Sequence, residues 1–170
     1  MLTNLFRRKP ANTEPEPQAV VISTSGKFEV EVRGESFHQQ TISKLVGASG
    51  NVQTDDDRRR ATLRVWLRPE PENPHDPNAV LVTALSGHPL GHLPRELCAS
   101  YQDVLNEVGD RARIWCEACA FGSRVEGRWN YGIWLDLPSA AELRTVLDGL
   151  SDRAVAEMKT TEGLRRTISR

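Results

Sequence analysis

The residues best suited to chemistry lie between Arg68 and Val82, where a polar loop rich in proline leads into an apolar run. Four prolines fix their own φ angles and also restrict the residue that precedes each of them. His75 and Asp76 are therefore held side by side in a stiff loop. A planar ring can stack on a base, and a carboxylate can accept a hydrogen bond from a hydroxyl, so this loop is suited to recognition.

The residues that flank this pair allow two interpretations of the loop. Arg68 precedes it and Asn78 follows it, and an arginine can pair with a phosphate. In the alternative interpretation, the side chains of Asn73 and Asp76 only bond to nearby backbone and close a tight turn. The local sequence leaves both interpretations open.

Metal-dependent chemistry finds less support in the sequence. Cys116 and Cys119 have the spacing of half a zinc knuckle, which Cys98 and His92 would have to complete. In a strand, however, residues an odd number apart point to opposite faces. His75-Asp76 lacks the further carboxylates or histidines of a metal-dependent hydrolase, and the chain has no phosphate-binding glycine loop with lysine, no GxSxG and no HExxH. We therefore predict no catalytic residue, no metal and no cofactor.

The elements that position these residues follow from hydrophobic periodicity. Alternating apolar residues predict strands over 27–33, 63–67, 79–85, 90–93, 111–121 and 128–137. A helix is predicted from Pro94 to Gly109, a second from the capping box Ser139 to Glu142, and a short helix or turn near 42–46. Segment 50–60, with three aspartates before three arginines, is expected to be a solvated loop whose arginines could touch phosphate.

This order predicts a mainly β domain with helices (α+β), a small open barrel of the OB or SH3-like kind with one inserted helix and a C-terminal helix. The 170 residues fit one domain. We expect a disordered leader over 1–24, the domain over 25–137, and a helical extension with a basic tail over 138–170.

Composition narrows the class of partner. With 38% hydrophobic residues but only short apolar stretches, the sequence predicts no membrane span and no secretory signal, hence a cytoplasmic protein with reduced cysteines. The formal net charge of -1 argues against a protein that coats long duplexes. A small, focused nucleic-acid site remains compatible with it.

Three sequence blocks together resemble the HIRAN domain family, a β-rich module of DNA-repair translocases and short bacterial proteins. Val30–Phe37 is similar to the family's first strand and the aromatic after its glycine, and the loop before Val82 is similar to its signature. Gly91–Leu97 is similar to its strand-to-helix junction. The blocks occur in the family's order over residues 28–137.

The resemblance implies capture of the 3' end of single-stranded DNA in a repair or processing context, with a repair or replication protein as a further partner. It implies that Asp76 accepts the hydrogen bond of the 3'-hydroxyl and that His75 and Phe37, with Phe121, stack on bases. The remaining implied contacts are polar or phosphate-facing: His38, Arg68, His92 and Arg95. Ser36-Phe37-His38 replaces the Arg-Tyr-Tyr run of DNA-binding relatives, and the loop aromatic is histidine instead of tyrosine.

The sequence also fits a different class, a protein-interaction adaptor in which the same groove is vestigial or grips a peptide terminus. Its support is the near-neutral charge and the extra C-terminal helix with a basic tail. The choice between DNA and RNA, the oligomeric state and the pathway are not encoded in any motif.

Overall fold

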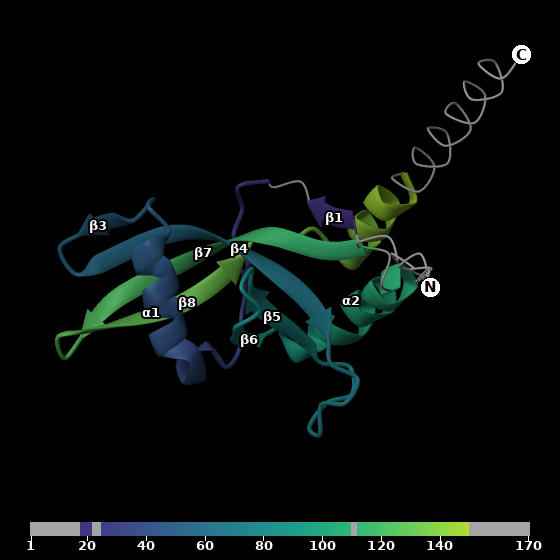
Figure 1. Ribbon diagram of the computed structural model, residues 1–170, viewed down its shortest axis with the longest axis horizontal. Helices are drawn as coiled ribbons and strands as arrows, with labels where there is room; N and C mark the ends of the chain where they lie inside the picture. Colours follow the sequence, from purple (N-terminus) through teal and green to yellow (C-terminus); the bar gives the residue numbers. More distant parts are fainter. Residues whose placement is uncertain (1–17, 22–24, 110–111, 150–170) are drawn as a thin grey trace, which may run out of the picture.

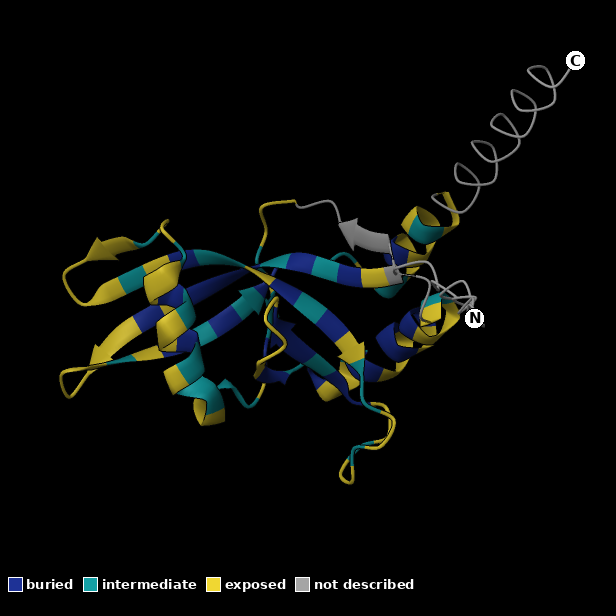
Figure 2. Ribbon diagram, in the orientation of Figure 1, coloured by how far each residue is buried: buried dark blue, intermediate teal, exposed yellow. Residues whose placement is uncertain are grey.

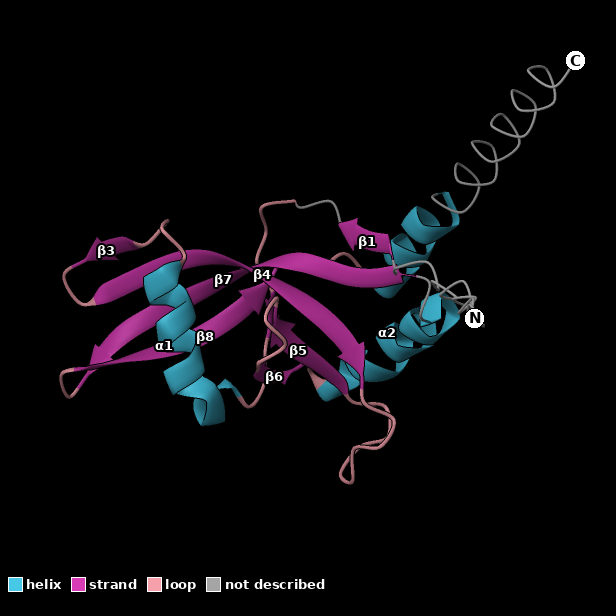
Figure 3. Cartoon of the chain, in the orientation of Figure 1, coloured by secondary structure: helices cyan, strands magenta, loops and turns pink. Residues whose placement is uncertain are grey.

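The computed structural model describes residues 18–21, 25–109 and 112–149 (Figure 1). Its elements follow in this order: β1 (Gln18–Val21), β2 (Val30–Glu31), the 3-10 helix η1 (Glu35–His38), α1 (Gln39–Ala48), β3 (Gln53–Asp55), β4 (Arg58–Pro69), β5 (Val80–Ala84), β6 (Pro89–His92), α2 (Arg95–Val108), β7 (Ala112–Val125) and β8 (Arg128–Leu135). Residues 140–149 form a further helix. Figure 3 shows the strands as one curled sheet with helices around it.

The sheet curls far enough for its two outer strands to meet. Its strand order is β2-β8-β7-β4-β5-β6, with β3 paired to β4 and β1 paired to β7. Arg33, just after β2, forms a bridge pair with His92 of β6, and two backbone hydrogen bonds of 2.8 Å join them. The fold is therefore the expected mainly β, OB-like half-barrel with helices, joined at one residue pair.

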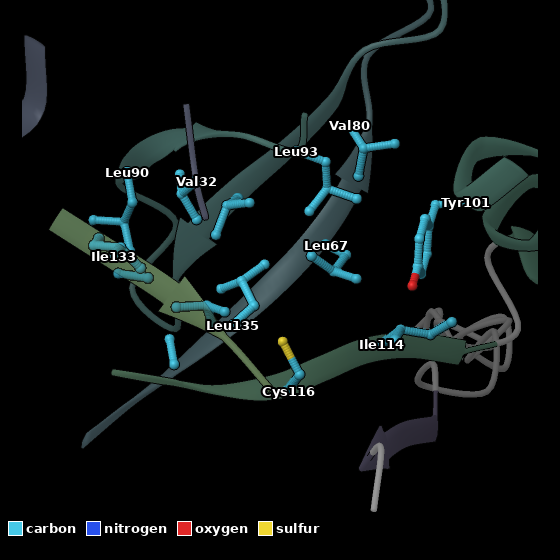
Figure 4. Packing of buried hydrophobic residues seen from close by; sticks show 14 of the residues in the cluster. Val32, Leu67, Val80, Leu90, Leu93, Tyr101, Ile114, Cys116, Ile133 and Leu135 are labelled. Carbon is cyan, nitrogen blue, oxygen red and sulfur yellow. The ribbon is translucent and has the colours of Figure 1, made fainter. Parts of the chain in front are cut away.

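The long strand β4 explains where the core lies. Burial alternates along this strand (Figure 2): Ala61, Val65 and Leu67 are buried, and the exposed positions between them and beyond are Arg58, Arg60, Arg64 and Arg68. The inward face meets the buried residues of the neighbouring strands and of α2, drawn in Figure 4: Val32, Val80, Leu90, Leu93, Tyr101, Ile114, Cys116, Ile133 and Leu135. The barrel interior is thus filled by side chains.

The ends of two of the helices are set by the capping residues that the sequence predicts. Pro94 is the N-cap of α2 and Gly109 its C-cap, so the predicted helix is confirmed to within a residue at each end. Near 42–46 the chain forms a full helix, α1, which buries Ile42 and Val46. The predicted capping box is present, because Ser139 N donates to Glu142 Oε2 at 2.8 Å and Glu142 N donates to Ser139 Oγ at 3.3 Å.

Three boundaries differ from the sequence prediction. Gln18–Val21, assigned to a disordered leader, forms β1 beside Ala112–Trp115, because its β-branched residues find an open strand edge. The solvated loop over 50–60 is a β-hairpin that turns at Asp56, whose φ is 31°. β7 continues to Val125, so the loop expected over 122–127 is only a two-residue turn.

Residues 1–17 and 22–24 of the predicted leader and residues 150–170 of the predicted tail lie outside the described residues. Within the described part of the chain, no helix is long and apolar enough to span a membrane.

Candidate nucleic-acid interface

The proline-rich loop is held by hydrogen bonds between its own residues. The backbone amides of His75 and Asp76 donate to Asn73 Oδ1 at 3.0 and 3.3 Å. Asn78 N donates to Asp76 Oδ1 at 2.9 Å, and Gln102 of α2 donates to the carbonyl of Pro77 at 2.6 Å. The tight-turn interpretation is therefore correct, but it uses only one of the two carboxylate oxygens of Asp76.

The second oxygen of Asp76 faces the start of α2. Asp76 Oδ2 lies 3.7 Å from Arg95 Nε, and the Asp76 side chain is only 21% exposed whereas that of Arg95 is 87% exposed. Arg95 is the first residue of α2, so its guanidinium lies at the positive end of the helix dipole. A half-buried acceptor and a solvent-facing cation thus lie side by side, as capture of a hydroxyl and an adjacent phosphate requires.

A hydrogen bond between the side chains of Glu70 and His92 joins the loop to β6. His92 Nε2 lies 2.8 Å from Glu70 Oε2, which also accepts a hydrogen bond from Asn73 at 3.1 Å. Burial raises the pKa of the Glu70 carboxyl, but the hydrogen bonds with His92 and Asn73 and the nearby Arg68 guanidinium outweigh this effect, so the pKa lies below its ordinary value. Glu70 therefore fixes the orientation of the His92 ring.

Strand register aligns the basic residues of this region. Arg68 on β4 pairs with Leu81 on β5, Leu81 pairs with His92 on β6, and His92 pairs with Arg33. Directly paired residues point to the same face of a sheet, so these side chains form one row. Gly91 permits the approach of Arg33, because a Cβ at this φ of 142° would lie 2.4 Å from the Arg33 carbonyl oxygen.

Five of the eight residues expected in the site gather here. We call the following group the loop site: Arg68, Glu70, His75, Asp76, His92 and Arg95. Phe37 and His38 belong to η1, which contacts β6, and the Phe37 ring is 88% exposed and so free to stack. Phe121 lies elsewhere, paired with Arg60 on β4, eight residues and roughly 26 Å of strand from Arg68.

Sequence reasoning missed Glu70, Arg33 and Gln102 as supports of the loop site. Glu70 carried one usable signal, a carboxylate inside the proline-rich loop, whereas the roles of Arg33 and Gln102 depend on contacts distant in sequence.

Cys116 and Cys119 face different surroundings: Cys116 packs in the core and Cys119 accepts a hydrogen bond from Arg60 Nε at 3.1 Å. The described residues contain no group of three or more side chains able to hold a metal ion.

The architecture is that of a small OB-like half-barrel domain with a polar loop beside the start of a helix. The family comparison makes this specific: the HIRAN domain model matches residues 25–129, more than half of the chain. The chain therefore belongs to the HIRAN domain family, which is known for nucleic-acid binding.

Two solved structures are also similar. A protein from Lactobacillus plantarum shares 17% identity, with 62% of this chain and 88% of that chain covered and a TM-score of 0.32. The HIRAN domain of human HLTF shares 16% identity, with 52% of this chain and 83% of that chain covered and a TM-score of 0.27. Among the curated proteins compared with the chain, none matches.

Proposed function

We propose that this protein captures the 3'-hydroxyl end of single-stranded DNA in its loop site, without catalysis, as a cytoplasmic module for DNA repair or processing. The observation that carries the proposal is the half-buried Asp76 carboxylate beside the exposed Arg95 guanidinium. Asp76 Oδ2 accepts the hydrogen bond of the terminal hydroxyl, and Arg95 pairs with the adjacent phosphate.

The other residues of the site orient the strand end. Glu70 orients the His92 ring beside the path of the strand, and Arg68 in the same row offers a second cation. Phe37 and His75 are both exposed, so stacking of bases on these rings costs no core packing. Unlike the proline-stiffened loop, the Phe37 ring stands out from η1 and can adjust to different bases.

The test compares two strands that are identical except for a 3'-hydroxyl or a 3'-phosphate. We expect the phosphate end to bind more weakly by at least ~1–3 kcal/mol, because the hydroxyl donor is lost and a negative charge faces Asp76. Asp76→Asn should weaken binding of the hydroxyl end and narrow this difference. Fluorescence anisotropy with labelled strands measures both effects.

Asp103→Asn is the matched control, because it makes the same change of charge at an exposed position on α2. It should leave the discrimination between the two ends unchanged. Equal affinity of the wild-type protein for both ends would overturn end capture and favour the adaptor function.

A further inference from the structure

A second surface runs along the outward face of β4. Arginines occupy four of its six alternate positions, and Thr62 and Trp66 occupy the other two. We call this group the arginine ladder: Arg58, Arg60, Arg64 and Arg68. Neighbouring alternate positions on a strand lie about 6.8 Å apart. All four arginines are exposed, so the ladder is a regular row of cations in contact with solvent.

Aromatic rings accompany the ladder on the neighbouring strand. Phe121 pairs with Arg60, and its ring lies 5.3 Å from the Arg60 guanidinium. Trp115 pairs with Trp66, and the Arg64 guanidinium lies 4.8 Å from the Trp115 ring. The Arg60 guanidinium also lies 5.8 Å from the Phe28 ring, so cation–π contacts with described rings hold both Arg60 and Arg64 on this face. Arginine planes and aromatic rings are the surfaces on which bases of single strands stack.

The positive charge of the ladder is only partly compensated. In register, Glu117 lies opposite Arg64 and Asp55 lies opposite Arg58, which leaves Arg60 and Arg68 without a carboxylate partner in the paired strands. None of the four arginines forms a salt bridge with a described residue. A polyanion therefore gains these cations without first breaking an ion pair in the described part of the chain.

The surface beside the ladder is hollowed at both of its ends. A cavity of about 700 Å³ is lined by Arg58, Arg60 and Phe121 among other residues, and one of about 580 Å³ is lined by Trp66 and Arg68 among others. Such hollows accommodate planar bases next to cations. The ladder also meets the loop site directly, because Arg68 belongs to both.

We propose that the arginine ladder binds the backbone of a single-stranded nucleic acid that continues from the loop site toward its 5' side. Charge complementarity and continuity with the loop site favour this occupant. The direction of the strand rests on the proposed end capture, whereas the attraction of the ladder for a strand does not. From Arg68 to Arg58 the row measures roughly 33 Å, long enough for several nucleotides, and OB-type barrels bind roughly 4–16 nucleotides.

The first test measures affinity against strand length with the full chain. A trimer reaches only the loop site, so we expect affinity to rise steeply between about three and about ten nucleotides and then to level off. Each phosphate neutralised by the ladder adds roughly 0.7 to the log–log salt slope. An affinity and a salt slope that do not change with length would overturn the ladder.

The second test removes two arginines of the ladder in the double variant Arg60→Gln/Arg64→Gln. Its affinity for the longer strand should fall on the order of tenfold per arginine, and its salt slope should fall by about 1.4. Binding of the trimer should not change. Arg124→Gln is the matched control, because Arg124 lies on β7 but stacks over Trp129 on the opposite sheet face. An effect of Arg124→Gln equal to that of the double variant would refute the assignment.

A closed circular single strand separates this proposal from end capture, because a circle has no 3'-hydroxyl. If the ladder acts, the circle binds and is weakened by the ladder variant but not by Asp76→Asn. Loss of end discrimination with retained binding of the circle would refute end capture alone. Discrimination between ends without any effect of the ladder variant would refute the ladder alone, and no binding of any strand would refute both.

Discussion

The loop site and the arginine ladder share Arg68 of β4 but are built in different ways. In the loop site, hydrogen bonds between residues two or three positions apart fix Asp76, and prolines limit the backbone before folding. In the ladder, the contacts of Arg60 and Arg64 with described side chains are to residues distant in the sequence, such as Cys119 and Trp115. The common direction of the two arginines comes from the alternation of a strand that is paired with β7 throughout this stretch.

Because of this difference, substitutions should disturb the geometry of the two regions in different ways. A loop fixed by its own side chains loses geometry when one polar side chain is removed, although the barrel remains folded. A ladder fixed by strand pairing keeps its geometry until the sheet itself is disturbed. The following predictions use this contrast, from the largest expected effect to the smallest.

Gly91→Ala should cause the largest loss, because it disturbs the pair that joins β6 to Arg33. The new Cβ would meet the Arg33 carbonyl oxygen at 2.4 Å and Val32 Cγ1 at 2.6 Å, and the φ of 142° is strained for alanine. We expect the free energy of unfolding to fall by roughly 2–5 kcal/mol. Urea denaturation measures this loss.

Gly47→Ala is the matched control for this change. Nothing lies within 4 Å of a Cβ at Gly47, which sits inside α1, so the variant should be neutral or more stable by up to about 1 kcal/mol. Equal stability of the two variants would show that the contact between Arg33 and His92 does not join the barrel.

Asn73→Ala should loosen the loop site alone. The variant removes the acceptor of the His75 and Asp76 amides and one donor to Glu70, at a cost of about 1 kcal/mol in stability. Discrimination between 3'-hydroxyl and 3'-phosphate strands should shrink several-fold, while the salt slope for long strands stays the same. Anisotropy titrations on both strands measure these effects.

Asn51→Ala provides the counterpart beside the ladder. Asn51 Nδ2 donates to the carbonyl of Thr62 at 3.1 Å, so its loss affects the edge of β4. It should leave end discrimination intact. A loss of discrimination in both variants would show that the two regions do not respond separately.

Glu70→Gln should have the smallest effect, and that effect should depend on pH. Because folding lowers the pKa of Glu70, its charge stabilises the folded state above the ordinary value of 4.5, and this contribution is lost as the pH falls through the lower folded value. The side chain is 31% exposed, so solvent screening limits the loss at pH 7 to below about 1 kcal/mol. Denaturation at neutral pH and near pH 3 measures the change. A difference that persists unchanged in acid would assign the role of Glu70 to packing.

Several parts of this structure are determined by short stretches of sequence. The prolines around Asp76 and the side chain of Asn73 specify the turn, Pro94 and Gly109 limit α2, and Ser139 with Glu142 begins the last described helix. Each of these depends on bonds that span at most a few residues. Their physical signals are therefore visible before folding.

Other features depend on the tertiary structure, because they need partners that are distant in the chain. β1 forms only where it can pair with β7, and the segment of aspartates and arginines forms a hairpin because β3 pairs with β4 and β4 pairs with β7. Phe121 was expected at a strand end, as a stacking ring or an edge of the core, and only strand register shows that it lies beside Arg60. Sequence alone determined that a stiff loop presents His75 and Asp76. Only the tertiary structure decided which cations and rings lie beside them, because curling of the sheet and pairing of its strands are properties of the whole chain.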